Sequence, residues 1–292
     1  MLEINSMYCV ACDSSCSGEI YLAKSYVDSS YGRFCQCTAC GTLNVIDSID
    51  YDSLYSNRKS TNYPTAHDNL LNKAFSYLKQ YYLSLKIPDL LKGLPTTATI
   101  LDYGCGSGDL ANAAYRYRPG LVFAADVQAD RPKTLLEDIE YFQISKIPQN
   151  IKVDLVVMRH VLEHIQDPVR ALTSIARQLT PKGQIIIEVP SERSVFRRWL
   201  GARWPGYFFP YHVYVFSEKG MRFLVARSGL EIIGEAPCNP PIMGVLFEDL
   251  GLNRSVSRLL SIMLYPFQWL LNRSTNGPEA FMVRVQVKSN QR

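Results

Sequence analysis

The stretch of residues 99–109 constrains the fold of this chain more than any other. An apolar, β-branched run leads into the acid Asp102, and three glycines then stand at alternate positions: Gly104, Gly106 and Gly108. A helix-like segment covers residues 110–117. Glycine permits positive φ and lets a ligand approach the main chain closely, and free N–H groups at a helix start favour polar or anionic ligand groups. The stretch predicts a buried strand, a tight turn and a helix that bind a nucleotide-like ligand.

Acidic residues around this turn narrow the ligand class. The dinucleotide fingerprint requires a third glycine three residues beyond the second, and Asp109 stands there instead. The carboxylates of Asp102 and Asp109 disfavour binding of a negatively charged pyrophosphate and favour binding of a positively charged ammonium group. The next apolar run, 121–125, ends in Asp126, which is placed to accept hydrogen bonds from ribose hydroxyls. A ribose and a cationic amino-acid end together indicate S-adenosylmethionine (SAM).

Four motifs in register carry a family resemblance over residues 98 to about 236. The glycine turn resembles motif I of class I SAM-dependent methyltransferases, and Asp126 resembles their motif II acid. The runs 153–168 and 179–190 are similar to the family's fourth strand with its "LEH…DP" turn and to its fifth strand. The resemblance implies an α/β, Rossmann-like sheet of seven strands. It implies SAM contacts from these residues: Asp102, Gly104, Cys105, Gly106, Gly108, Asp126, Val127, Arg159 and His160.

Composition excludes several other classes. The chain has 292 residues, of which 47% are hydrophobic and 20% charged, and a net charge of +4 gives no reason to expect a nucleic-acid partner. The first residues do not read as a signal peptide, and no apolar run reaches the roughly 20 residues that span a bilayer. We therefore expect a cytoplasmic enzyme.

Cysteines crowd the first 40 residues, where reduced thiols favour metal over disulfides. Two Cys-x-x-Cys pairs, about 25 residues apart, suit a structural zinc ribbon with the ligands Cys9, Cys12, Cys37 and Cys40. Cys16 and Cys35 are spare thiols that could substitute in the set. Short strands are expected at residues 19–22 and 31–34.

Three domains follow from these patterns: a zinc-binding lobe at 1–47, a linker and helix at 48–97, and a methyltransferase domain at 98–292. The tyrosine-rich residues 48–66 read equally as a surface linker or as a lid over the SAM pocket. Apolar periodicity predicts a helix over 67–86 that ends near Pro88.

Further elements are expected along the methyltransferase domain. Helices are predicted over 131–137, 168–179 and 218–228, with Pro181, Lys182 and Gly183 stopping the second. Strands are predicted over 139–142, 153–158, 184–189, 230–235 and 281–287.

Three residues near the carboxyl ends of the strands are candidates for catalysis. His160 and Glu188 emerge where an open α/β sheet binds its ligand. His212 is a candidate general base, because histidine titrates near neutral pH, and equally a structural histidine. The run 211–217 partly resembles the "EH…YFS" stretch of nucleotide-sugar C-methyltransferases, which also carry a cysteine-rich lobe, although Tyr211 replaces their acid. We interpret His164 as a packing or capping residue.

A long insertion, 237–280, separates the last two expected strands. Its apolar residues and flanking arginines suit a helix lying in a membrane interface through 254–273, and they also suit a helix packed as a substrate cover or homodimer contact. Pro266 should kink it.

These features predict a SAM-dependent methyltransferase for a small-molecule or glycan acceptor, such as a sugar or lipid-linked saccharide, by O-methylation. Alternatives are a quinone- or lipid-type O-methyltransferase at the inner membrane surface and a sugar C-methyltransferase. A non-catalytic SAM-binding module is a different class.

Overall fold

The computed structural model describes residues 8–28, 30–51, 54 and 70–288. Contacts divide the chain into two compact units. The first comprises 1–51, 160–173 and 188–283, and the second comprises 52–159, 174–187 and 284–292. Most of the proposed lid at 48–66, including Tyr55 and Tyr63, lies outside the described residues.

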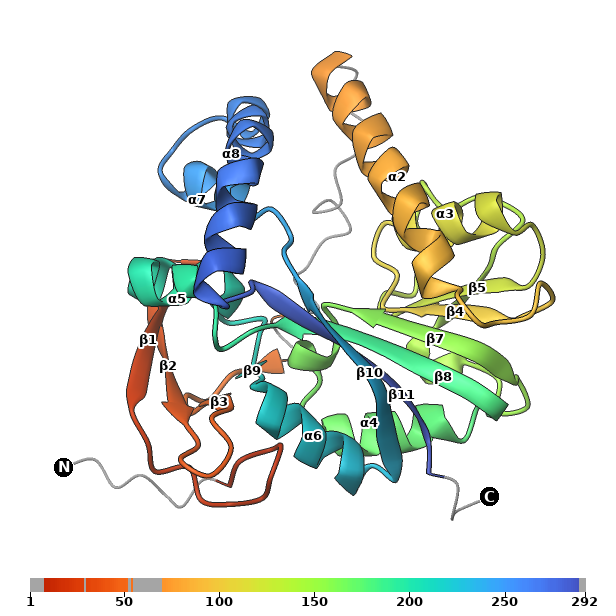
Figure 1. Cartoon of the computed structure of the whole chain (residues 1–292), viewed down its shortest axis with the longest axis horizontal. Coiled ribbons are helices and arrows are strands. Elements are labelled where there is room, and N and C mark those ends of the chain that lie inside the picture. Colours follow the sequence, from red (N-terminus) through yellow and green to blue (C-terminus); the bar gives the residue numbers. More distant parts are fainter. Residues whose placement is uncertain (1–7, 29, 52–53, 55–69, 289–292) are drawn as a thin grey trace. The chain divides into compact units, whose positions relative to one another are not determined.

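A seven-stranded sheet has the order β10-β11-β8-β7-β4-β5-β6, which confirms the predicted α/β class. β4 pairs in parallel with β5 and β7, and β5 pairs in parallel with β6. The strands are β4 (Ile100–Tyr103), β5 (Val122–Asp126), β6 (Glu140–Gln143), β7 (Val153–Arg159), β8 (Leu179–Pro190), β10 (Leu230–Cys238) and β11 (Ala280–Val287). The two strands around the insertion, β10 and β11, are neighbours in the sheet, as expected (Figure 1).

Helices connect these strands. They are α2 (Leu70–Leu90), α3 (Asp109–Tyr117), α4 (Pro168–Ala176), α5 (Val195–Leu200) and α6 (Glu218–Arg227), with short 3-10 turns η2 (Ile144–Lys146), η3 (Leu162–His164), η4 (Gly201–Arg203) and η5 (Pro205–Tyr207). In the second unit, α3 packs on β4 and β5 and against α2 (Figure 1).

Some predicted boundaries were wrong. Residues 131–137 form no helix, because the guanidinium of Arg131 instead binds the carbonyls of Leu135, Leu136 and Ile139 in a loop. α2 continues through Pro88 to Leu90.

The predicted stop at 181–183 lies inside β8, and α4 ends earlier, at Ala176. A Cβ on Gly183 would stand 2.9 Å from the Val153 carbonyl oxygen, so this glycine permits close strand approach and does not stop a helix.

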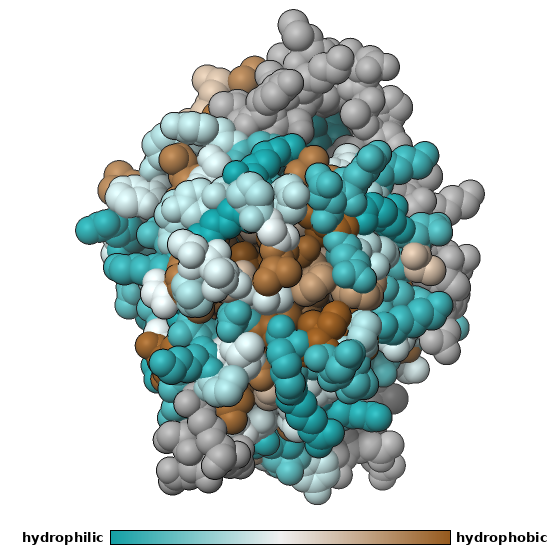
Figure 2. Space-filling view, turned by 90° about the vertical axis from the view of Figure 1, so that its right-hand side faces the viewer, coloured by the Kyte–Doolittle hydropathy of each residue, from teal (hydrophilic) through white to brown (hydrophobic). Residues whose placement is uncertain are grey.

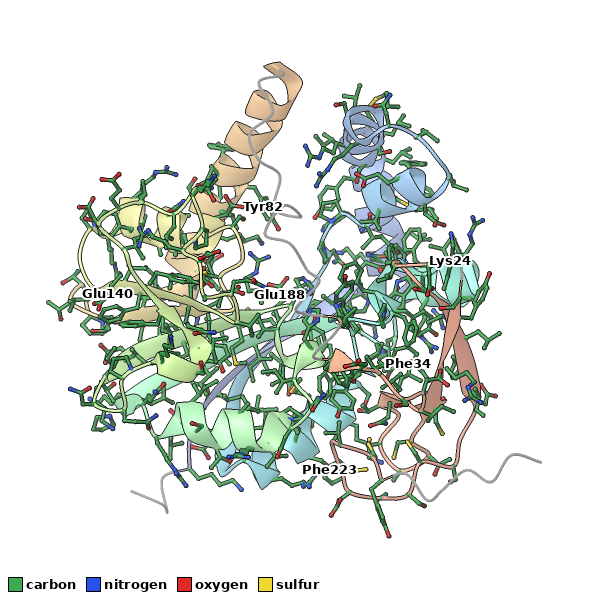
Figure 3. All side chains as sticks on the ribbon, turned by 180° about the vertical axis from the view of Figure 1, so that it is seen from behind. Lys24, Phe34, Tyr82, Glu140, Glu188 and Phe223 are labelled. Carbon is green, nitrogen blue, oxygen red and sulfur yellow. The ribbon has the colours of Figure 1, made fainter. Side chains whose placement is uncertain are left out.

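The first unit holds a separate four-stranded antiparallel sheet of the order β1-β2-β3-β9. Its strands are β1 (Ile20–Lys24), β2 (Tyr31–Gln36), β3 (Leu43–Val45) and β9 (Tyr214–Val215). Asn44 on β3 pairs with Tyr214 on β9, 170 positions later in the chain. The core of this unit includes Phe34, labelled in Figure 3, packed with the buried Trp204 and Tyr207.

Two helices fill the insertion, α7 (Met243–Asp249) and α8 (Arg254–Thr275). Asn253 caps the start of α8 by accepting a hydrogen bond from Val256 N. Pro266 lies within α8 without ending it. The two helices pack together. Within the part of the chain that the structure describes, no helix combines the length and apolarity needed to cross a bilayer.

The face of the molecule seen in Figure 2 is mainly hydrophilic, with a smaller hydrophobic area near its centre.

Candidate functional site

The glycine turn forms as the sequence predicts, between β4 and α3. Gly104, Gly106 and Gly108 have φ of 79°, 55° and 78°, the left-handed region that favours glycine. Gly104 N and Cys105 N both donate to the carbonyl of Ala125, at 2.7 and 2.9 Å, which fixes the turn to the end of β5. A Cβ on Gly108 would approach Leu135 Cδ1 to 2.7 Å. A side chain at position 108 would therefore have to displace Leu135.

Asp126 ends β5 with a buried side chain that faces the turn. Gly106 N donates to its Oδ2 at 2.8 Å and Gln128 N to its Oδ1 at 3.3 Å. A carboxylate has about four acceptor positions, so each oxygen retains capacity for a ribose hydroxyl. These residues fit the nucleoside part of SAM. Beside them, Cys105 is buried and Val127 is exposed.

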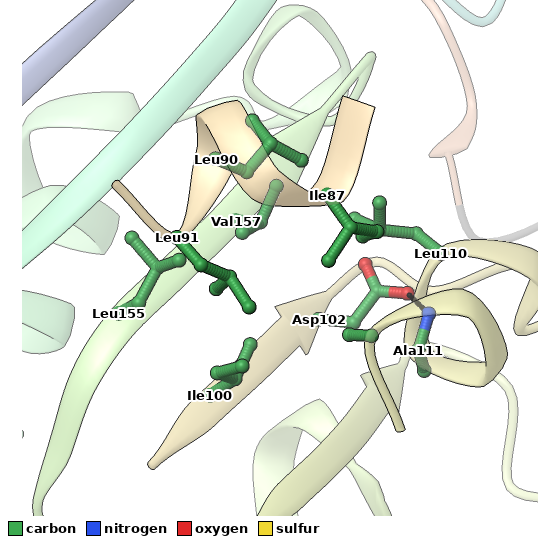
Figure 4. Close-up of a pocket in the computed structure, with 10 residues that line it drawn as sticks. Ile87, Leu90, Leu91, Ile100, Asp102, Leu110, Ala111, Leu155 and Val157 are labelled. Atoms are coloured by element: carbon green, nitrogen blue, oxygen red, sulfur yellow. Dashed lines mark hydrogen bonds between the residues drawn. The ribbon is translucent and has the colours of Figure 1, made fainter. Parts of the chain in front are cut away.

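Asp102 has a different environment. Its side chain is buried beside a pocket of mainly apolar side chains, including Ile87 and Leu110, and its Oδ2 accepts a hydrogen bond from Ala111 N at 3.1 Å (Figure 4). Burial raises the pKa of Asp102 to about 7, opposed by the Ala111 N–H and by the charge of Arg159. One carboxylate oxygen therefore holds the first turn of α3.

Asp109, at the start of α3, accepts hydrogen bonds from Ser107 Oγ at 2.7 Å and Gln80 Nε2 at 2.8 Å. A carboxylate in the first helical turn is favoured by the helix dipole. The second unit thus presents three carboxylates around one turn.

A second group of polar residues lies in the first unit and centres on Glu163 of η3, which is 0% exposed. His160 Nδ1 lies 3.3 Å from Glu163 Oε1, and His212 Nε2 lies 3.7 Å from the same oxygen. His160 Nε2 is 3.5 Å from Oε1 of Glu188, which stands near the end of β8 (Figure 3). Of the three residues predicted from the sequence, His160 and His212 lie beside the Glu163 carboxylate, and Glu188 joins the group through His160.

Backbone strain and charge mark this cluster. His160 has φ of 53°, a conformation that costs a non-glycine residue roughly 1–3 kcal/mol. Burial lowers the pKa of His160, but Glu163 and Glu188 outweigh it and raise the pKa to about 9. Burial, together with the nearby His164, lowers the pKa of His212 to about 3.

Sequence reasoning did not assign Glu163 a role and took His164 as a packing residue. The signal that could have found them is the spacing of His160, Glu163 and His164, which places three polar groups within one turn directly after a buried strand.

The cysteine lobe brings together the four thiols predicted as ligands. Sγ atoms of Cys9 and Cys40 lie 3.6 Å apart, those of Cys12 and Cys37 lie 3.5 Å apart, and all four fall within 4.8 Å of one another. Zinc with thiolates at about 2.3 Å in a tetrahedron separates sulfurs by about 3.8 Å, so the four thiols fit this ion.

Both halves of the cluster repeat one backbone pattern. Asp13 N donates to Cys9 O and Gly41 N to Cys37 O, and both donors have positive φ, 64° and 86°. Cys16 lies outside the four-thiol group, where its Sγ accepts from Asn44 Nδ2 at 3.2 Å.

The strand order and the turn after β4 define a Rossmann-like, nucleotide-binding α/β protein. The model of the methyltransferase domain family matches residues 75–235, more than half of the chain. The chain belongs to this family, the class I SAM-dependent methyltransferases. A search of curated protein sequences found no match.

Several solved structures of methyltransferases resemble the chain at low sequence identity. Mitomycin 7-O-methyltransferase is 17% identical, with a TM-score of 0.47 over 78% of this chain and 59% of that one. A SAM-dependent methyltransferase from Archaeoglobus fulgidus is 18% identical, with a TM-score of 0.47 over 72% of this chain and 93% of that one. The 1,6-didemethyltoxoflavin-N1-methyltransferase of Burkholderia thailandensis is 14% identical, with a TM-score of 0.49 over 90% and 98%. The chain spans about three fifths of the length of the mitomycin enzyme.

Proposed function

We propose that this protein transfers the methyl group of SAM to a hydroxyl of a small-molecule or glycan acceptor, such as a sugar or lipid-linked saccharide. The observation that carries the proposal is the turn 104–108, in which three glycines have positive φ and Gly106 N donates to the carboxylate of Asp126. Family membership supports the reaction type.

SAM supplies an electrophilic methyl on a sulfonium. In the reaction the sulfur–carbon bond breaks, an oxygen–carbon bond forms, and the acceptor hydroxyl loses one proton. Asp126 and the turn hold the nucleoside, and Asp102 keeps the start of α3 in place. Rate enhancement comes mainly from alignment of the two reacting groups.

The proton needs an acceptor, and the cluster around Glu163 offers the candidates. We propose His212 for this role, because its lowered pKa leaves the imidazole neutral, and Glu188 as a second candidate. The raised pKa of His160 keeps its ring protonated near neutral pH, so we propose that His160 balances the charge of the two glutamates. A carbon acceptor, as in sugar C-methylation, would require the same proton removal.

Calorimetry with SAM and with S-adenosylhomocysteine tests the cofactor site. We expect binding by the wild type, a loss of at least tenfold in affinity for Asp126→Ala, and no change for Glu140→Gln, whose side chain is exposed on the neighbouring strand β6. Absence of binding by the folded wild type would refute the proposal.

A transfer assay separates an enzyme from a non-catalytic module. SAM labelled in the methyl group is incubated with nucleotide sugars, lipid-linked saccharides and quinols, and the labelled product is identified. SAM binding without transfer to any hydroxyl acceptor would favour the binding module.

We also propose that Cys9, Cys12, Cys37 and Cys40 hold a structural zinc ion. Four thiolates close the coordination sphere, so such an ion supports the fold and does no chemistry. Metal analysis of the purified chain and of Cys12→Ser tests this assignment.

A second candidate is action at a membrane surface, favoured by one face of α8. Leu259, Met263, Phe267 and Leu270 follow helical spacing and are 57%, 67%, 62% and 60% exposed. Arg273 lies over the ring of Trp269, 5.4 Å from its centroid, a pair suited to the headgroup region. Flotation with anionic vesicles tests this, with Met263→Glu as the variant expected to stay in solution. If the wild type instead elutes as a dimer that Met263→Glu dissociates, the face is a homodimer contact.

A further inference from the structure

The side chain of Glu163 is buried without a hydrogen-bond donor. Neither carboxylate oxygen has a hydrogen-bond partner among the described residues. Withdrawing a carboxylate from water costs several kcal/mol unless a cation or donors compensate it. The backbone holds the residue in place, because Val213 N donates to the Glu163 carbonyl at 2.9 Å. The fold therefore keeps a buried carboxylate whose charge must be balanced by the neighbouring histidines or by a bound cation.

Two histidines next to this carboxylate are oriented by backbone carbonyls. His212 Nδ1 lies 2.9 Å from the carbonyl oxygen of Gly206, and His164 Nδ1 lies 3.0 Å from that of Tyr211. A carbonyl only accepts, so each Nδ1 carries a proton, and in a neutral ring the lone pair then lies on Nε2. Fixing the tautomer through the other ring nitrogen is the arrangement that metal-binding histidines use.

Ligand atoms of these three residues converge. One atom each from Glu163, His164 and His212 lies within 4.8 Å of the other two, and His212 Nε2 is 3.7 Å from Glu163 Oε1. Around one zinc ion, with bonds of about 2.0–2.2 Å, such atoms lie about 3.3 Å apart. Small side-chain movements would bring the ligand atoms from their present separations to this distance. The rings of His164 and His212 meet edge to face, with their centroids 4.6 Å apart.

We propose that Glu163, His164 and His212 bind a divalent transition-metal ion. Two imidazoles and one carboxylate suit zinc or iron(II) and leave a coordination position open. The open position would take a water molecule or another oxygen ligand. With its Nε2 bound to the ion, His212 would act as a metal ligand and not as a base. This site is distinct from the four-cysteine site, which is closed.

His160 is the competing counter-ion. It lies 3.3 Å from Glu163 Oε1, and a proton on its ring could compensate the carboxylate without a metal. The two explanations differ in metal content: removing His160 leaves a metal site intact but abolishes a purely protonic pair.

Metal content of the full chain tests the proposal. The protein is stripped with a chelator, reloaded with zinc and analysed by mass spectrometry. We expect two zinc equivalents for the wild type, one for Glu163→Gln and for His212→Gln, and two for His160→Gln. Cys12→Ser should lose the zinc of the four-cysteine site and keep the zinc bound by Glu163, His164 and His212. A wild type with a single equivalent, absent from Cys12→Ser, overturns the proposal.

Cobalt(II) keeps the test decisive if the variants do not fold. Cobalt(II) is added to wild-type protein whose four cysteines already hold zinc. We expect weak absorption bands in the visible range and no sulfur-to-cobalt charge-transfer band, because the proposed ligands are nitrogen and oxygen atoms. No new bands at cobalt saturation would overturn the proposal. S-adenosylhomocysteine binding is measured on the same samples. Its absence in the wild type refutes the proposed function, whereas the metal count judges this site alone.

Discussion

Ser217 donates its hydroxyl to the carbonyl of Cys40, 2.5 Å away, and its Oγ also accepts the Gly220 N–H at 2.8 Å. Ser217 is the N-cap of α6, so a single side chain links the second cysteine pair to the start of a helix nearly 180 residues later. The stability of α6 and the geometry of the thiols should therefore depend on each other.

Replacing this cap tests the link. We expect Ser217→Ala to lower the free energy of unfolding by about 1 kcal/mol or more and to speed zinc release to a chelator. Asn253→Ala removes the N-cap of α8, whose side chain accepts from Val256 N of the same helix, so it should cost similar stability and leave zinc release unchanged. Thermal unfolding and a colorimetric chelator measure the two effects, and equal zinc release by both variants would contradict the link.

Removing the zinc ion that we propose at Cys9, Cys12, Cys37 and Cys40 should destabilise more than the first 50 residues. β3 pairs with β9, and Val45 N donates to Val213 O at 2.9 Å, so loosening the lobe frees the segment that carries His212. Hydrogen exchange with and without chelator should show faster exchange at residues 213–217 and unchanged exchange in β4 and β5. Protection of 213–217 in the metal-free protein would argue against this coupling.

Gly108→Ala should abolish SAM binding while Gly93→Ala should not. Both glycines have similar φ, 78° and 81°, but a Cβ at 108 meets Leu135 at 2.7 Å whereas a Cβ at 93 meets nothing within 4 Å. In each variant an alanine adopts the left-handed conformation, which lowers the free energy of unfolding by about 1–2 kcal/mol. Only Gly108→Ala also displaces the turn. Calorimetry and thermal unfolding compare them; equal affinities would show that the turn does not hold the cofactor.

Glu279 should make stability depend on pH between about 4.5 and 7. Burial raises the pKa of this carboxyl to about 7, although Trp204 and Ser194 donate hydrogen bonds to it. The folded state then holds a proton that the unfolded state releases, so stability falls as pH rises through this window, by up to about 3 kcal/mol. Glu279→Gln should flatten that slope in urea unfolding, and an unchanged slope would mean another group is responsible.

The features that could be predicted from the sequence are those that depend on residues close together in the chain. The strand–turn–helix at 99–117 follows from glycine spacing and apolar runs, and the thiol group follows from two Cys-x-x-Cys pairs whose local turns place their sulfurs. Each signal lies within a few residues, so tertiary packing had little opportunity to override it.

Features that depend on distant partners could not be found this way. β9 is two residues long, too short for any periodicity, and exists because β3 offers an unpaired edge. β8 continues through Pro181 and Gly183 because its neighbours supply the pairing, against the local propensity of those residues. Glu163 and His212 likewise lie close together only because the folded chain brings residue 212 next to a residue 49 positions earlier.

The pairing of β3 with β9 has a consequence for how the protein is made. Translation delivers residues 8–45 early, yet the sheet that they begin stays incomplete until residue 215 has left the ribosome. During that interval the edge of β3 is exposed to other chains. Early zinc capture by the nascent thiols would shield the segment until its last strand arrives, so metal supply during synthesis should govern the yield of folded protein.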